Sequence, residues 1–170
     1  MALSHTVFRQ HTGMRFSLLD RITDLQSGES IQAVKNLSLA EEYLQDHFPG
    51  FPIMPGVLMV EAMVQTSAWL MRSSENFAYS TVLLKEAKAV KFNKFVTPGK
   101  TLVLQSTVHK KADREWTFKA QGTIDGESAV SGRLILNQSN LVENGDRFAD
   151  ADKLQTTKMR ELFDVLWVPS

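Results

Sequence analysis

Hydrophobic positions are densest between residues 57 and 71, where the polar residues are Glu61 and the three uncharged residues at 65–67. A helix that is apolar nearly all round is a buried helix. Pro55-Gly56 precedes the run, and the cation of Arg72 follows it near the expected negative end of the helix dipole. The pattern therefore predicts a buried helix over 57–71.

Beyond residue 100 the apolar positions recur at every second residue. This alternation covers 102–108, 116–124 and 128–136. It is typical of antiparallel strands with one buried face and one wet face. Asp125-Gly126 predicts a hairpin turn between the last two strands, and Pro98-Gly99 predicts a turn between 90–96 and 101–108.

The remaining segments have weaker patterns. Residues 30–39 predict a strand and residues 16–22 a short helix, whereas residues 1–14 show no clear period. One buried helix with several antiparallel strands predicts an α+β domain whose sheet wraps around the helix. We divide the chain into an N-terminal arm (1–14), this domain (15–137) and a C-terminal extension (138–170).

A polar linker at 137–146 leads into the extension. Apolar residues then recur at helical spacing, namely Leu154, Met159, Leu162, Phe163 and Leu166. The pattern predicts an amphipathic helix with Asp150 or Asp152 as its N-cap. We expect its apolar stripe to pack on its own domain or across a dimer.

Composition excludes several classes of protein. The chain has 170 residues, 19 Lys plus Arg and 19 Asp plus Glu, and this balance argues against a nucleic-acid binder. The absence of cysteine removes disulfides, thiol nucleophiles and thiolate metal sites. Residues 1–14 show no signal peptide, and no apolar run reaches the roughly 20 residues of a membrane span. We expect a cytoplasmic protein without a nucleic-acid or membrane partner.

Residues 46–61 carry the candidate chemistry. His47 precedes a loop stiffened by the prolines at 49, 52 and 55, each of which fixes one backbone dihedral. Histidine is the usual general base near neutral pH. Taken alone, a histidine in such a position is more often a surface or structural residue than a general base.

Glu61 lies on the predicted buried helix and has no cation at the three- or four-residue spacings. An acid in such a place suits proton donation. Gln65 lies one turn further on the same face and is placed to bond the carboxyl group. Such a contact, or one to a partner chain, also explains Glu61 without a catalytic role. Gly56 opens the helix, where a backbone N–H can polarise a carbonyl oxygen.

The run His47-Phe48-Pro49-Gly50-x-Pro52-x-Met54-Pro55-Gly56-Val57-Leu58-x-x-Glu61-Ala62 resembles the active-site signature of the FabZ-type 3-hydroxyacyl-[acyl-carrier-protein] dehydratases. The match continues through Met63 and Gln65, and a looser similarity covers residues 15–136. The resemblance implies a hot-dog fold, in which a curved antiparallel sheet wraps a long central helix. It also implies a homodimer or a trimer of dimers.

The resemblance implies loss of water from a (3R)-3-hydroxyacyl thioester to give the trans-2-enoyl thioester in fatty-acid synthesis. His47 would take the C2 proton, and Glu61 of the other subunit would protonate the departing hydroxyl. The N–H of Gly56 would hold the thioester carbonyl, and Gln65 would orient the network. No metal and no redox cofactor is implied, and the substrate would be carried on acyl carrier protein. Glu61, where the related dehydratase–isomerases have Asp, favours simple dehydration.

Some residues depart from the family pattern. Phe51 stands where relatives often have a polar residue, and Val64, Thr66 and Trp69 are bulkier than expected on the central helix. We place Phe51, Met54, Val64 and Trp69 along the acyl tunnel. The bulky residues either reshape this tunnel or repack against the C-terminal extension, and the sequence leaves both alternatives open.

Five lysines fall in the sixteen residues 85–100 and are opposed there only by Glu86. A basic rim at Lys88, Lys91 and Lys94 would steer an acidic acyl carrier protein. Lysines that protect a solvated edge strand explain the same pattern. A thioesterase or hydratase acting on acyl-coenzyme A, and a non-catalytic acyl-binding subunit, are the alternative functions.

Overall fold

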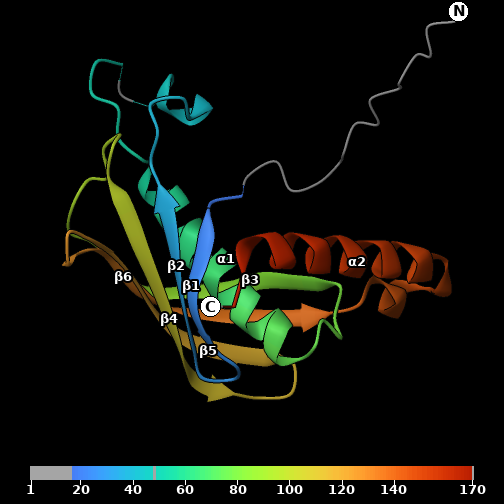
Figure 1. Cartoon of the computed structure of the whole chain (residues 1–170). Helices are drawn as coiled ribbons and strands as arrows, with labels where there is room; N and C mark the ends of the chain where they lie inside the picture. Colours follow the sequence, from blue (N-terminus) through green and yellow to red (C-terminus); the bar gives the residue numbers. More distant parts are fainter. Residues whose placement is uncertain (1–16, 48, 170) are drawn as a thin grey trace, which may run out of the picture.

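Within residues 17–47 and 49–169, which the computed structural model describes, a six-stranded antiparallel sheet wraps around one long helix (Figure 1). The strands are β1 (Arg21–Gln26), β2 (Ser30–Asn36), β3 (Thr81–Phe92), β4 (Thr101–Lys111), β5 (Glu115–Ile124) and β6 (Glu127–Ser139). Their order in the sheet is β1-β2-β4-β5-β6-β3. The α+β hot-dog architecture is therefore confirmed, with β1 and β3 at the edges.

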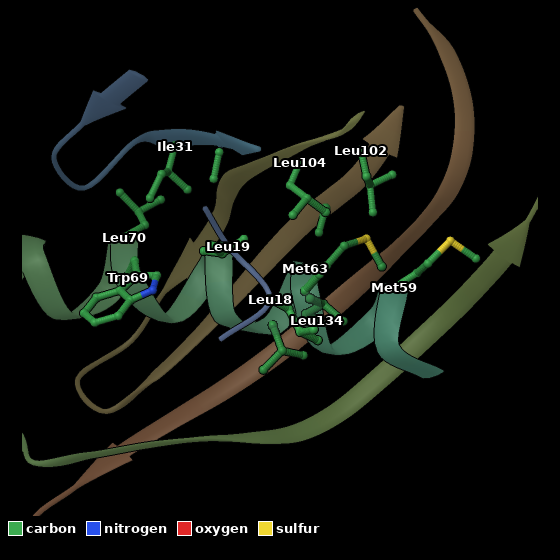
Figure 2. Packing of buried hydrophobic residues seen from close by; sticks show 14 of the residues in the cluster. Leu18, Leu19, Ile31, Met59, Met63, Trp69, Leu70, Leu102, Leu104 and Leu134 are labelled. Atoms are coloured by element: carbon green, nitrogen blue, oxygen red, sulfur yellow. The ribbon is translucent and has the colours of Figure 1, made fainter. Parts of the chain in front are cut away.

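Helix α1 (Gly56–Ser74) is the predicted buried helix and forms the centre of the core. Figure 2 shows Met63 and Leu70 of α1 in one cluster with Leu102 and Leu104 of β4 and with Leu134 of β6. The buried hydroxyl groups of this helix, on Thr66 and Ser67, have hydrogen-bond partners inside the core. Ser67 Oγ lies 2.7 Å from Ser106 Oγ of β4, so a buried hydroxyl has a partner, as burial requires.

The three strands predicted from alternation are β4, β5 and β6, and the predicted turn at Asp125-Gly126 joins the last two. Asp125 has φ = 52° and Gly126 has φ = 80°. Two consecutive residues with positive φ are typical of a type I′ turn, whose twist matches that of the flanking strands.

The short helix predicted over 16–22 is wrong within the described residues, which begin at 17. Leu18 and Leu19 are buried without helical structure, and β1 begins at Arg21. A short apolar run does not distinguish a strand from a helix by its period, and pairing with β2 decides the outcome here. The predicted arm, residues 1–14, lies outside the described residues.

The strand predicted at 90–96 is also placed differently. It begins at Thr81 and ends at Phe92. Two register shifts in its pairing with β6, between Leu84 and Glu86 and between Lys88 and Lys91, interrupt the alternation that would have revealed it.

Helix α2 (Ala149–Leu166) packs on its own domain. Met159 and Leu166 are buried in the core cluster. The ring of Phe163 lies 5.9 Å from that of Trp69 on α1 and 5.4 Å from that of Phe77. None of the described helices is long and apolar enough to cross a membrane.

The segment predicted as a linker is more ordered than expected. Strand β6 extends into it, and the short 3-10 helices η2 (Leu141–Asn144) and η3 (Asp146–Phe148) follow. The predicted N-cap of α2 is wrong, because the helix begins directly after Phe148. The Asp152 carboxylate instead accepts the N–H groups of Leu141 and Val142, both at 2.8 Å, and the hydroxyl of Ser80. It therefore ties the start of α2 to the segment before β3.

Candidate active site

His47 lies in the loop that follows the short helix η1 (Glu42–Leu44). The Lys35–Glu41 ion pair, at 2.6 Å, anchors the residue before η1 to β2. The Nδ1 atom of His47 lies 3.2 Å from the carbonyl oxygen of Ile53. Since a carbonyl only accepts, Nδ1 carries the proton and the basic lone pair is on Nε2. This is the arrangement that a general base requires.

Gly56 is the first residue of α1, and a side chain there would be crowded by Phe92. A Cβ atom at this position would lie 3.0 to 3.3 Å from ring atoms of Phe92. The first N–H groups of a helix have no partner within the helix, and the dipole makes them suitable for a negative oxygen. His47 and Gly56 both line a cavity of about 320 Å³, together with Met54 and residues of the segment 92–95.

The contact predicted between Gln65 and Glu61 is confirmed. The Gln65 side-chain amide donates to the Glu61 carboxylate at 3.0 Å, and its carbonyl oxygen accepts the N–H of Leu18 at 2.9 Å. These two bonds fix the orientation of the amide. Glu61 itself is half-buried in the single chain rather than fully buried, because its side of α1 faces a cavity.

This second cavity has a volume of about 530 Å³ and lies between α1, the start of β3, and α2. Glu61 and Gln65 line it, but His47 and Gly56 do not. A single chain therefore presents the candidate base and the candidate acid on two different cavities. The assignment of the two residues to one site shared between subunits stays a prediction.

The four residues that the sequence places along an acyl tunnel do not share one cavity. Val64 and Trp69 line the Glu61 cavity, and Met54 lines the His47 cavity. Phe51 lines neither; the residue is 54% exposed, and its ring meets the ring of Phe95 edge-on with the centroids 6.1 Å apart. The cavity lined by Val64 and Trp69 is also bounded by α2. These bulky residues can therefore both shape the cavity and pack against the C-terminal extension.

Glu86 is the one acid within residues 85–100, but the folded chain brings further acids to the lysine cluster from outside this stretch. Three of these lysines meet carboxylates from other strands or turns: Lys85 meets Glu115 at 2.5 Å, Lys100 meets Asp125 at 2.7 Å, and Lys94 meets Glu127. Lys88 meets Glu86 of its own strand at 3.0 Å. Among the described residues no ion pair is formed by Lys91. Cross-strand pairing supplies the missing acids, and sequence proximity does not reveal it.

Sequence reasoning missed two cations that belong to the same surface. Arg133 of β6 lies directly opposite Lys88 of β3 on one side and Lys119 of β5 on the other. With Lys91 they line a hollow of about 630 Å³, which we call the basic hollow. Lys119 and Arg133 occupy exposed positions of strands that the alternation had predicted, so the same pattern could have identified them.

Comparisons with known proteins identify the family of the chain. A family model described as a FabA-like domain matches residues 11–133. The chain is 43% identical over 118 residues to the 3-hydroxyacyl-[acyl-carrier-protein] dehydratase FabZ of Oenococcus oeni, which covers 69% of this chain and 85% of that protein. The chain belongs to the FabZ-type dehydratase family.

Other relatives extend the comparison. The FabZ protein of Wolbachia pipientis is 35% identical over 119 residues, or 70% of this chain and 83% of that protein. Among solved structures, a chain of the dehydratase heterocomplex ApeI:P from Xenorhabdus doucetiae has a TM-score of 0.64 at 22% identity, covering 78% of this chain and 90% of that one. It supports the hot-dog fold. The family match ends at residue 133, so α2 lies beyond the matched region.

Proposed function

We propose that the protein removes water from (3R)-3-hydroxyacyl-[acyl-carrier-protein] to give trans-2-enoyl-[acyl-carrier-protein] in fatty-acid synthesis. One observation carries this proposal: a FabZ-type chain holds His47 with its basic nitrogen on Nε2, in one cavity with Gly56, the first residue of α1. A pure acyl-binding subunit needs no such base. We also propose a cytoplasmic location, which agrees with the absence of cysteine.

In this reaction Nε2 of His47 removes the proton from C2, and the C2–H electron pair moves toward the thioester carbonyl. The N–H of Gly56 donates a hydrogen bond to that carbonyl oxygen as negative charge develops on it. Glu61 gives its proton to the C3 hydroxyl, the C3–O bond breaks, and water leaves as the C2–C3 double bond forms. General acid–base catalysis of this kind contributes about 10²- to 10⁴-fold in rate for each group.

We propose that each site combines His47 and Gly56 of one chain with Glu61 of the partner subunit in a homodimer, which can assemble further into a trimer of dimers. The separation of the two cavities supports this arrangement. So does β3, an edge strand that exposes Leu83 (64%) and Phe92 (53%). An exposed apolar edge strand is a template for pairing with another chain.

Subunit complementation tests the shared site. His47→Ala and Glu61→Gln should each lower the rate of enoyl formation at least about 100-fold. When the two variants are co-expressed with different tags, the mixed dimer has one intact site. Random pairing then restores about a quarter of the wild-type activity.

Co-expression of two differently tagged His47→Ala chains is the control and should remain inactive. Purified mixed dimers that stay inactive would contradict the shared site. Free thiol released in place of enoyl product would contradict dehydration and favour a thioesterase.

We further propose that the predicted docking residues Lys88, Lys91 and Lys94 contact acyl carrier protein, together with Lys119 and Arg133 of the basic hollow. Like charges directly opposite each other destabilise a sheet, and Lys88, Arg133 and Lys119 form such a row. An acidic partner would relieve this repulsion and would be steered by it.

Charge reversal tests the docking surface. Lys91→Glu should raise KM for the carrier-bound substrate, and the effect should shrink at high salt. Lys110→Glu, on β4 outside the basic hollow, is the matched control. Equal KM values for the two variants would refute docking at this surface.

A further inference from the structure

The Glu61 cavity runs along one face of α1. Glu61, Gln65, Ala68 and Arg72 all line it, at spacings of three and four residues that place them in one row. Arg72 follows Glu61 by eleven residues, so the two side chains start about 16 Å apart along the helix axis. The cavity thus has an acid at one end of the row and a guanidinium at the other.

Helix α2 supplies a wall that the family match does not include. Leu154, Gln155, Lys158 and Met159 of α2 line the cavity, opposite the row on α1. In Figure 1, α2 lies alongside β3, whose first residues complete the wall. The lining is therefore apolar along much of its length, but it contains two cations, Arg72 and Lys158.

Neither cation has a carboxylate partner among the described residues. The Arg72 guanidinium donates to the backbone carbonyls of Ser80 at 3.1 Å and Tyr79 at 3.4 Å, which leaves its charge uncompensated. Burial lowers the pKa of Arg72 to about 10, so the group remains a cation at neutral pH. The nearby Asp152 is already engaged by Ser80, Leu141 and Val142.

We propose that this cavity receives an acyl chain whose distal end carries a carboxylate, bound by Arg72 and Lys158. The inference rests on the proposed function, because Glu61 must act on C3 at the other end. With carbon–carbon bonds of about 1.5 Å, an extended chain advances roughly 1.3 Å per carbon, so about a dozen carbons span the row.

The physical reason is a difference in desolvation. A methyl-ended chain would displace water from Arg72 and Lys158 and give neither cation a partner. A carboxylate accepts two parallel hydrogen bonds from a guanidinium and one from an ammonium group. The site therefore discriminates against the methyl-ended chain as well as favouring the carboxylate-ended one.

The test compares two carrier-bound 3-hydroxyacyl substrates of equal length, one ending in a carboxylate and one in a methyl group. Wild-type protein should prefer the carboxylate-ended substrate at least about tenfold in kcat/KM. Lys158→Met should reduce that preference about tenfold. Lys153→Met, on the same helix but lining a different hollow, should leave the preference unchanged. Lys158 is the residue to replace, since Arg72 also supports the backbone at Tyr79 and Ser80.

A binding measurement separates this inference from the proposed function. Trp69 lines the cavity, so its fluorescence reports on occupancy by a straight-chain dicarboxylate or by the monocarboxylate of equal length. Trp69→Phe identifies which part of the signal comes from this residue. Tighter dicarboxylate binding that Lys158→Met weakens supports the inference, even if neither substrate is dehydrated and the proposed function fails. Dehydration of both substrates without preference would overturn the inference and leave the function standing.

Discussion

Replacing Phe163 with alanine removes an aromatic ring through which α2 packs on the hot-dog domain. This ring lies 5.9 Å from Trp69 and 5.4 Å from Phe77, in a tilted and an edge-on arrangement respectively. Truncating a fully buried phenylalanine to alanine costs about 3–5 kcal/mol. Since Phe163 is half-buried, we expect a loss of about 2–3 kcal/mol, which includes the two aromatic contacts.

Thermal and urea unfolding, monitored by circular dichroism at one fixed protein concentration, measure this loss. For a chain of this size a loss of 1 kcal/mol lowers Tm by about 2–4 °C, so Phe163→Ala should lower it by roughly 5–10 °C. Val165→Ala is the matched control, because Val165 lies on the same helix and is 74% exposed. It should change stability by no more than about 0.5 kcal/mol.

Two results would refute the reasoning. Equal Tm values for Phe163→Ala and Val165→Ala would show that the aromatic cluster does not stabilise the fold. A separate low-temperature transition in wild-type protein, lost in Phe163→Ala, would show that α2 unfolds independently of the domain.

Three further predictions concern packing, pH and assembly. Gly122→Ala should lower the free energy of unfolding by about 1–3 kcal/mol in urea titrations, because the new Cβ atom would lie 2.9 Å from side-chain atoms of Leu102 and Val130. Burial alone raises the pKa of Asp152, but hydrogen bonds from the Ser80 hydroxyl and two backbone amides outweigh it and hold the pKa below the ordinary 3.8. An acid whose pKa is lower in the folded than in the unfolded state stabilises the fold at pH values above its unfolded-state pKa. The difference in unfolding free energy between wild type and Asp152→Asn should therefore be constant above about pH 5 and should shrink to zero as the pH falls through the folded-state pKa. A difference that does not depend on pH would contradict this. Leu83→Glu should reduce the assembly to smaller species in size-exclusion chromatography with light scattering, whereas an unchanged mass would exclude Leu83 from the interface.

The sequence by itself determined the elements whose signals are local. The apolar run at 57–71 predicted α1, and alternation with an Asp-Gly turn predicted β4, β5 and β6. These predictions succeeded because side-chain periodicity and turn conformation depend on neighbouring residues alone. The run from His47 to Glu61 likewise identified the family before any geometry was available.

Only the tertiary structure decided features that depend on long-range pairing. Register shifts in the pairing with β6 interrupt the alternation of β3, so the sequence pattern did not reveal this strand. Carboxylates on β5, on β6 and in their connecting turn form ion pairs with lysines that lie far from them in the sequence. Asp152 accepts hydrogen bonds from residues ten and eleven positions earlier instead of capping its helix. Folding also places His47 and Glu61, fourteen residues apart, on different cavities, because the His47 loop meets the end of β3 at Phe92 whereas Glu61 faces the start of β3 at 81–83.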